Sequence, residues 1–312
     1  MSTSKKYTRF LNVLYATICA LTIQSFAQAA SGVQAFEVIA PSGYKSVILG
    51  SMHIPDTRLR QPVPSVLDGY TQFIVEFDTN KASLQKSRPL NETVIDGGLE
   101  SLFRGTPVRA PWALDLNNRQ ISMLKKNVMC QSGHVIKDAE TFFNVILMSR
   151  SAEYAAHFAM YPCSDGRKSR DEILMNAAIE RRVKIVSLDN PDEVDLLRQQ
   201  IPESFYTSVV KRLLSKEHEY DLRKVVDALN AGDMESLYRF GVGDMAKPEI
   251  AAFAKLMIEQ RNLLWIPKLI EVLNEGKAFV LVGGAHLSGK TGILNLLRNQ
   301  GFVIHPVTLP SI

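Results

Sequence analysis

The segment 277–307 constrains the fold more than any other part of the chain. It begins with a short, β-branched and wholly apolar run, 278–282, which is bounded by glycine and predicts a strand buried on both faces. A turn that carries His286 follows, and then an amphipathic helix that Gly301 ends. A last short strand is expected at 302–304. In open α/β sheets ligands bind at the carboxyl ends of the strands, so this turn is a candidate site.

The same turn also matches the phosphate-loop pattern GxxxxGK[ST], from Gly284 to Thr291. Only 21 residues follow Thr291, too few for the later strand whose acidic residue holds magnesium in such proteins. The export signal described next also places the chain where nucleoside triphosphates are scarce. A phosphate-loop nucleotide binder is therefore the weakest alternative, and Lys290 is the residue that would test it.

The first 29 residues predict a secretory signal peptide. A basic start precedes a predominantly apolar stretch at 10–23, and Ala-Gln-Ala at 27–29 is a small-residue cleavage site. The alternative is an uncleaved membrane anchor, but the apolar stretch is short and interrupted by polar residues. We therefore expect cleavage after Ala29 and a periplasmic or secreted protein with no stable membrane span.

The remaining chain, 30–312, is long and apolar enough for one large domain, since 46% of all residues are hydrophobic. Three basic side chains of the signal account for most of the formal net charge of +4. The mature chain is thus nearly neutral, and no nucleic-acid partner is expected. Cys130 and Cys163 remain after cleavage. In an oxidising compartment one disulfide is the default, with two buried thiols as the alternative.

Three further short apolar runs, 45–50, 72–77 and 184–188, resemble the run at 278–282, and another strand is expected at 35–39. Helical periodicity predicts helices between them. They are expected at 64–70, 117–127, 140–161, 170–182, 192–200, 204–231 and 249–275, the last kinked at Pro267. The predicted fold class is α/β. A central, mainly parallel sheet is covered by helices, with a large helical region inserted at about 85–182 and 204–275.

Each of the four buried strands carries a candidate metal ligand at its carboxyl end. His53 and His286 each close a Gly-x-x-His motif, and Glu76 and Asp189 end the other two strands. If the strands are parallel, these side chains meet at one edge of the sheet. Two neutral imidazoles with one or two carboxylates suit a first-row divalent ion. The alternative is that each histidine is a hydrogen-bonded structural residue.

At these residues the chain resembles the TraB/GumN family, which is related to the Tiki metalloproteases and more distantly to erythromycin esterases and haem-binding ChaN proteins. The resemblance spans about 33–308. It rests on the segments 50–53, 75–78, 187–189, 260–262 and 282–286 with the helix that follows.

The resemblance implies a metal-dependent hydrolase scaffold centred on His53, Glu76 and His286. It also implies that Arg261 stabilises negative charge on the substrate. Asp189 is a departure, because the family commonly has glutamate there.

The leading hypothesis is an exported metallopeptidase that uses Mn, Co or Zn, with Glu76 and Arg261 as its catalytic residues. Its substrate would be a peptide or another small molecule. The alternative is a non-catalytic protein that binds haem, peptide or metal at the same edge of the sheet. A general base distinct from the metal ligands would separate the two hypotheses, and Glu76 is a candidate for either role.

Overall fold

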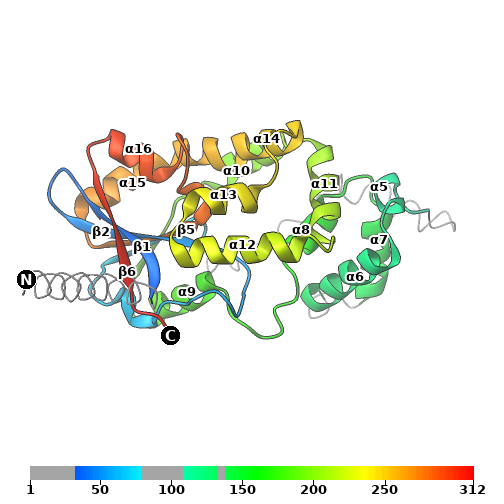
Figure 1. Cartoon of the computed structure of the whole chain (residues 1–312), viewed down its shortest axis with the longest axis horizontal. Helices are drawn as coiled ribbons and strands as arrows, with labels where there is room; N and C mark the ends of the chain where they lie inside the picture. The colour runs from blue at the N-terminus through cyan, green and yellow to red at the C-terminus, as the bar shows by residue number, and fades with distance from the viewer. Residues whose placement is uncertain (1–31, 79–107, 133–137) are drawn as a thin grey trace, which may run out of the picture.

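The computed structural model describes residues 32–78, 108–132 and 138–312. A six-stranded sheet lies at one end of an elongated molecule, and a group of helices lies at the other end (Figure 1). The predicted signal peptide, 1–29, and the start of the predicted helical insertion lie outside the described residues. Among the helices of the described ranges, none has the length and apolar character needed to cross a membrane.

The sheet has the strand order β4-β3-β5-β2-β1-β6. Its four parallel strands are β4 (Lys184–Ser187), β3 (Gln72–Val75), β5 (Ala278–Gly283) and β2 (Lys45–Ser51). The two antiparallel strands, β1 (Val33–Ile39) and β6 (Val303–Leu309), form the other edge. The predicted parallel core is therefore confirmed. Since its four strands point the same way, the residues that follow them gather at one edge.

Helices make up most of the remaining described chain. In chain order they are η1 (Pro64–Leu67), α5 (Pro111–Leu114), α6 (Asn118–Ser132), α7 (Ala139–Met148), α8 (Glu153–Met160), α9 (Arg170–Glu180), α10 (Pro191–Arg198), α11 (Glu203–Leu213), α12 (His218–Ala231), α13 (Met234–Val242), α14 (Pro248–Ala254), η2 (Lys255–Gln260), α15 (Arg261–Glu275), η3 (Gly284–His286) and α16 (Ile293–Asn299). This mixture of sheet and helices confirms the predicted α/β class.

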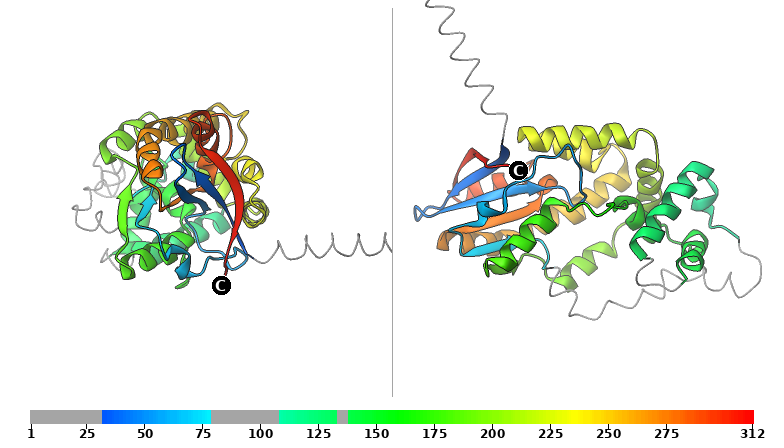
Figure 2. Two further views of the ribbon diagram at one scale, coloured as in Figure 1. Left: turned by 90° about the vertical axis from the view of Figure 1, so that its left-hand side faces the viewer. Right: turned by 90° about the horizontal axis from the view of Figure 1, so that it is seen from below.

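Alternate residues of the central strands point into two separate cores, as expected for strands buried on both faces. On one face Ile48 and Val280 pack with residues of α12, α13, α15 and α16. On the other face Leu49 and Phe279 pack with residues of η1 and α9. In Figure 1 α15 and α16 lie above the sheet and α9 lies below it, and the right-hand view of Figure 2 looks onto the α9 side.

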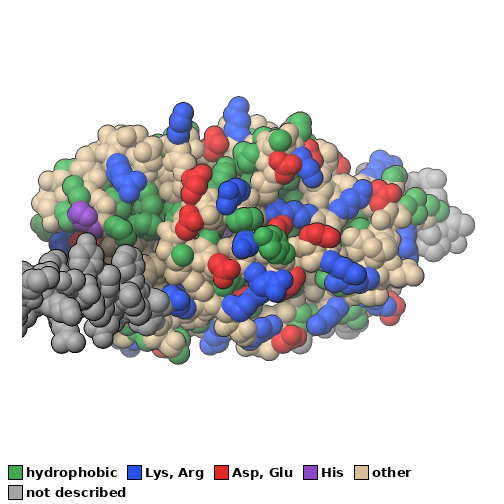
Figure 3. Space-filling view, viewed as in Figure 1, with side chains coloured by type: hydrophobic (Ala, Val, Ile, Leu, Met, Phe, Trp, Pro, Cys, Tyr) green, Lys and Arg blue, Asp and Glu red, His purple; other side chains and the backbone are tan. Residues whose placement is uncertain are grey.

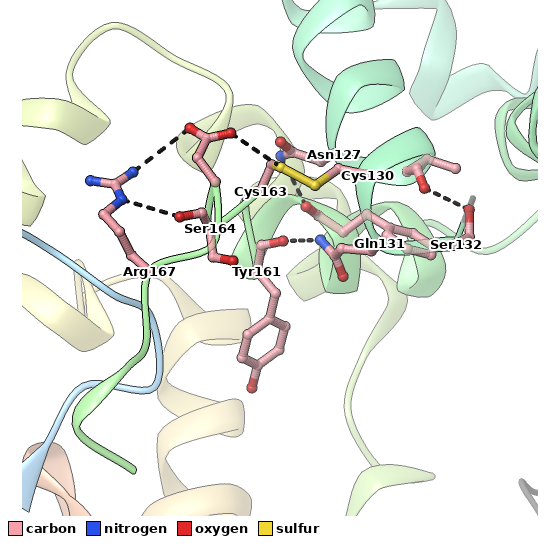
Figure 4. Close-up of a disulfide and its surroundings, with 11 residues drawn as sticks. Asn127, Cys130, Gln131, Ser132, Tyr161, Cys163, Ser164 and Arg167 are labelled. Atoms are coloured by element: carbon pink, nitrogen blue, oxygen red, sulfur yellow. Dashed lines mark hydrogen bonds and ion pairs between the residues drawn. A yellow bond between two sulfur atoms is a disulfide. The ribbon is translucent and has the colours of Figure 1, made fainter. Parts of the chain in front are cut away.

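The helices far from the sheet, α5 to α8 and α11, form a second core together with residues of α13, α14 and η2. Phe205 of α11 stacks on Phe253 of α14, with ring centroids 4.1 Å apart. Cys130 of α6 and Cys163, just after α8, form the predicted disulfide (Figure 4). On the face drawn in Figure 3, basic and acidic side chains are interspersed, which is typical of a solvated helical surface.

Two predicted helices are divided in the structure, so both single-helix predictions were wrong. The segment 140–161 forms α7 and α8, because the carboxylate of Glu203 accepts hydrogen bonds from the Ser151 hydroxyl and the Ala152 amide between them, at 2.6 Å each. Such side-chain contacts replace the helical hydrogen bonds of the backbone. The segment 204–231 likewise forms α11 and α12.

The last long helix, predicted over 249–275 with a kink at Pro267, changes its hydrogen bonding earlier than expected. α14 passes into the π-helical segment η2, and α15 then continues through Pro267. π-helical turns are rare and are found mostly at functional sites. This one ends immediately before Arg261 and Asn262, so it sets the direction in which these two side chains leave the helix.

Candidate active site

Three of the four predicted strand-end side chains meet at the carboxyl edge of the sheet. His53 lies just beyond β2, Glu76 directly follows β3, and His286 ends η3 after β5. Since β5 lies between β2 and β3, both imidazoles reach the same carboxylate oxygen. The Oε1 atom of Glu76 is 3.8 Å from Nε2 of His53 and 3.9 Å from Nε2 of His286. We call these three residues the trio.

Glu76 is held in place on both of its oxygens. Its Oε1 accepts a hydrogen bond from the backbone amide of Gly283 at 2.6 Å, and its Oε2 accepts one from Nη2 of Arg261 at 2.8 Å. Burial alone would raise the pKa of Glu76, but the two imidazoles and the guanidinium hold that pKa well below its usual range. Glu76 is therefore a carboxylate with a fixed orientation at the centre of the trio.

His286 is buried and its ring is oriented by Asn262. The Nδ2 atom of Asn262 donates to the carbonyls of His286 and Thr291 at 3.0 and 2.8 Å. Its Oδ1 is thereby left to face Nδ1 of His286 at 2.7 Å. Burial lowers the pKa of His286 to about 4 in spite of the nearby Glu76 carboxylate. The imidazole is therefore neutral at physiological pH.

His53 has a different environment, because its side chain is 44% exposed and its partner is charged. The Oδ1 atom of Asp171, in the first turn of α9, lies 3.2 Å from Nδ1 of His53. Burial acts to lower the pKa of His53. The hydrogen bond to Asp171 and the charges of Glu76 and Asp171 outweigh burial and raise this pKa to about 9. At neutral pH His53 is thus an imidazolium between two carboxylates.

Asp189, predicted as a possible ligand, lies behind the trio. Its oxygens accept hydrogen bonds from Nε and Nη2 of Arg261, at 3.3 and 2.8 Å, and from Nε1 of Trp265, at 2.8 Å. Arg261 is only 11% exposed and its guanidinium lies 4.6 Å from the centre of the Trp265 ring. The structure therefore directs Arg261 to the carboxylates of Glu76 and Asp189. Its expected action on a substrate stays a prediction.

The trio leaves a small space that exists because residue 283 has no side chain. A Cβ atom on Gly283 would lie 3.0 Å from Oε1 of Glu76, 3.4 Å from Nε2 of His53 and 3.5 Å from Cδ2 of His286. As the side chains stand, no group of three or more His, Cys, Asp or Glu in the described ranges is arranged to hold a metal ion. Tetrahedral ligands at about 2.1 Å from zinc lie roughly 3.4 Å from one another. The two Nε2–Oε1 distances within the trio, 3.8 and 3.9 Å, are a few tenths of an ångström longer.

Asp171, Asn262 and Trp265 are site residues that the sequence interpretation did not assign. Asn262 and Trp265 share the start of α15 with Arg261, so helical spacing could have suggested them. Asp171 had no such signal, because it lies 118 residues from His53 in the chain. Burial, together with the charges of Glu76 and Asp171, also raises the pKa of Tyr161. The Tyr161 phenol is therefore within electrostatic range of the trio.

A separate cavity of about 470 Å³ lies beside the loop that follows His286. Lys290 and Arg298 line it together with apolar side chains such as Phe36, and no residue of the trio does. The phosphate-loop pattern falls on this loop, but α16 begins only at Ile293. Lys290 is thus separated from the helix that a phosphate loop would place directly after it.

Fold and site together define a class: an α/β domain whose parallel strands end in two histidines and a glutamate, backed by an arginine. The model of the TraB/PrgY/gumN family matches residues 36–306, and the chain belongs to this family. The matched range includes all four parallel strands and the trio. Comparisons with curated proteins and with solved structures returned no match. The resemblance seen in the sequence is confirmed at the level of the family.

Proposed function

We propose that this chain is an exported hydrolase that binds one divalent ion through His53, Glu76 and His286 and cleaves peptide bonds. One observation carries the proposal. Two imidazole Nε2 atoms face a single carboxylate oxygen at 3.8 and 3.9 Å, while the Nδ1 atom of each ring faces an acceptor on the other side. Histidine ligands in metal sites are commonly oriented in this way.

The tautomer of His286 supports a cation in this place. The Nδ2 group of Asn262 donates hydrogen bonds to two carbonyls, which leaves Oδ1 facing Nδ1 of His286. Because Oδ1 can only accept, Nδ1 of His286 must carry the proton and donate it. The Nε2 atom of this neutral ring carries a lone pair and points at Oε1 of Glu76. Two acceptors that face each other in a buried place are stabilised by a cation between them. The donor types present therefore suit a metal, and the two imidazole–carboxylate distances would have to shorten by a few tenths of an ångström to bind it.

A divalent ion held there would supply Lewis acidity and activate water for hydrolysis. Two imidazoles and one carboxylate suit Mn, Co or Zn. The remaining side chains have supporting roles. Arg261 and the Gly283 amide keep Glu76 ionised and oriented. His53 is the half-exposed member of the trio, so a substrate would approach from its side.

A binding protein without turnover is the second candidate, and one observation favours it. Each of the three carboxylates described at the site is engaged: Glu76 by Arg261, Asp189 by Arg261 and Trp265, and Asp171 by His53. Hydrolysis needs a group that can accept a proton from water or substrate. If none of these carboxylates is released, the same site would hold haem, a peptide or a metal without chemistry.

Elemental analysis of the purified protein after incubation with Mn, Co or Zn tests the metal site. We expect about one bound ion in the parent and in His218→Ala, and none in the double variant His53→Ala/His286→Ala. A folded double variant that binds metal as the parent does would contradict the proposal. Peptide cleavage that is lost with chelator and restored by metal supports the hydrolase. Metal bound without turnover on a peptide panel favours the binding protein.

Export is tested separately. The intact mass of the protein recovered from the periplasm or medium should correspond to a chain that begins at residue 30. A protein found only in the cytoplasm with 1–29 still attached would contradict this part of the proposal.

A further inference from the structure

The first turn of α9 delivers two adjacent charged side chains to the end of β2. Arg170 is almost completely buried, and its guanidinium donates to the carbonyl of Gly50 at 2.5 Å and to that of Arg60 at 2.6 Å. Asp171 follows directly and reaches Ser51 and His53. The start of α9 is therefore fastened to the strand end from which His53 projects.

Both oxygens of Asp171 are used on this strand end. Its Oδ2 accepts a hydrogen bond from the hydroxyl of Ser51. Its Oδ1 lies 3.2 Å from Nδ1 of His53. The hydrogen bond from Ser51 restricts the carboxylate to one orientation, so Oδ1 faces the imidazole of His53. The opposite ring nitrogen, Nε2, is then directed at Oε1 of Glu76, 3.8 Å away.

An acidic side chain in the first turn of a helix has a simpler explanation, because it interacts favourably with the helix dipole. In α9, however, the capping is done by other residues. Ser169 and Glu172 form a capping box, with Ser169 Oγ accepting the amide of Glu172 and the Glu172 carboxylate accepting the amide of Ser169. Asp171 is thus not needed to cap α9.

The chain that leads into α9 is also anchored. Cys163 is bonded to Cys130 of α6, and Gln131 donates to the carbonyl of Tyr161 (Figure 4). The segment that carries Asp171 is thereby fastened at its beginning to the helical end of the molecule and at its end to β2. Little freedom remains for the carboxylate to move away from His53.

We propose that Asp171 is a positioning residue that holds Nδ1 of His53 and thereby aims Nε2 at the centre of the trio. Its importance for catalysis rests on the proposed function, whereas its hold on His53 does not. Partners of this kind typically change metal affinity by about 10-fold to 100-fold when they are removed.

The first experiment needs no metal. Nitrogen-15 imidazole spectra of the metal-free protein, assigned with His53→Gln, should show a protected Nδ1 proton on His53. The proton is present whether the ring is charged or neutral, and Asp171→Ala should remove its signal through exchange with water. Glu172→Ala is the matched control, because it alters the same helical turn. It should lower the unfolding temperature and leave the His53 signal in place. A His53 signal that persists in Asp171→Ala would overturn the proposal.

The second experiment uses Zn²⁺ alone as the probe. Titration should give an affinity roughly 10-fold to 100-fold weaker in Asp171→Ala than in the parent. Glu172→Ala should bind Zn²⁺ as the parent does. The affinity of Asp171→Asn, which keeps one acceptor oxygen, should lie between those of the parent and Asp171→Ala. Equal affinity in Asp171→Ala and the parent would refute the positioning role. If the parent binds no Zn²⁺, the proposed function fails, and the metal-free spectra still decide the role of Asp171.

Discussion

The two Gly-x-x-His motifs have the same sequence pattern and the same place at strand ends, yet their histidines differ in almost every physical property. His286 is buried, faces the neutral amide of Asn262, and its pKa is lowered to about 4. His53 is 44% exposed, faces the carboxylate of Asp171, and its pKa is raised to about 9. The motif decides where each ring lies. Burial keeps His286 neutral, whereas the carboxylates of Asp171 and Glu76 keep His53 charged.

This asymmetry gives the two halves of the site different roles. The His286 half is rigid, because Asn262 fastens the ring and both ends of the loop 286–291. The His53 half faces solvent and carries a proton that the proposed metal would displace. Metal binding near pH 7 should therefore release about one proton, from His53. The following predictions test the contrast, in order of decreasing expected effect.

Asn262→Ala should have the largest effect, because it strips partners from the buried half of the site. The ring of His286 and two carbonyls would each lose a hydrogen bond. At about 1–3 kcal/mol for each buried group, the free energy of unfolding should fall by roughly 4 kcal/mol. Equilibrium unfolding in urea measures this change in the free energy of unfolding. Asn230→Ala is the control, since Asn230 also bonds two backbone groups, those of Arg58 and Arg60, but is half-buried. A loss no larger than that of the control would show that His286 is not held as described.

Removal of the disulfide should affect the His53 half selectively. The bond spans 33 residues, so the chain-entropy estimate for Cys130→Ser/Cys163→Ser is a loss of about 3.5 kcal/mol in the free energy of unfolding. Because Cys163 precedes the segment that carries Asp171, the imidazole spectrum of His53 should also change. The spectrum of His286 should not. Equal changes at both rings would contradict the separation of the two halves.

The stability of the metal-free protein should depend on pH with opposite slopes for the two histidines. Between about pH 4 and 6.5 the unfolded chain protonates His286 and the folded chain does not, so stability rises with pH. From about pH 6.5 to 9 the folded chain keeps the His53 proton that the unfolded chain has lost, so stability falls as pH rises. The contributions are on the order of 3 kcal/mol for His286 and about 1 kcal/mol for His53, whose exposure screens the charges.

Unfolding measured across pH in His286→Gln and His53→Gln separates these contributions. In His286→Gln the free energy of unfolding should change much less between pH 4 and 6.5. A smaller dependence on pH should remain there, because the lowered pKa of Glu76 also makes stability rise with pH. His53→Gln should flatten the alkaline side. An unchanged acid side in His286→Gln would contradict a neutral His286.

Gly283→Ala tests the space between the two halves. Its Cβ would lie within 3.5 Å of an atom of each member of the trio. Metal affinity should fall by roughly 30-fold, which corresponds to about 2 kcal/mol. Gly50→Ala is the matched change in the first motif, where a Cβ would contact Gly284, Leu287 and Met234 instead. It should alter stability and leave affinity within about threefold. Calorimetric titration with Zn²⁺ compares them, and the idea fails if both variants bind alike.

Local sequence determined the strands and the place of the trio. Three of the parallel strands, β2, β3 and β5, are the short and almost wholly buried apolar runs that the sequence predicts, whereas β4, at the edge of the sheet, is only half-buried. His53, Glu76 and His286 come directly after such runs. Once the strands are parallel, their ends must meet at one edge. The disulfide also followed from the sequence, since Cys130 and Cys163 are the two cysteines that lie after the predicted signal peptide.

The ends of the helices were less predictable, for a physical reason. The break between α7 and α8 depends on Glu203, which begins a different helix, and apolar periodicity does not record such a contact. The π-helical segment before Arg261 is similarly hard to predict, because it is only six residues long and lies within a continuous helical stretch.

Only the tertiary structure decided the chemistry of the two histidines. Asn262 lies 24 residues from His286, and Asp171 lies 118 residues from His53. These partners contact the imidazole rings because α15 and α9 pack on the sheet. Such contact is needed because the electrostatic effect of a side chain on a pKa weakens rapidly with distance. A Gly-x-x-His motif therefore specifies where a ring will lie. Its pKa and its exchangeable proton depend on a helix that arrives from elsewhere in the chain.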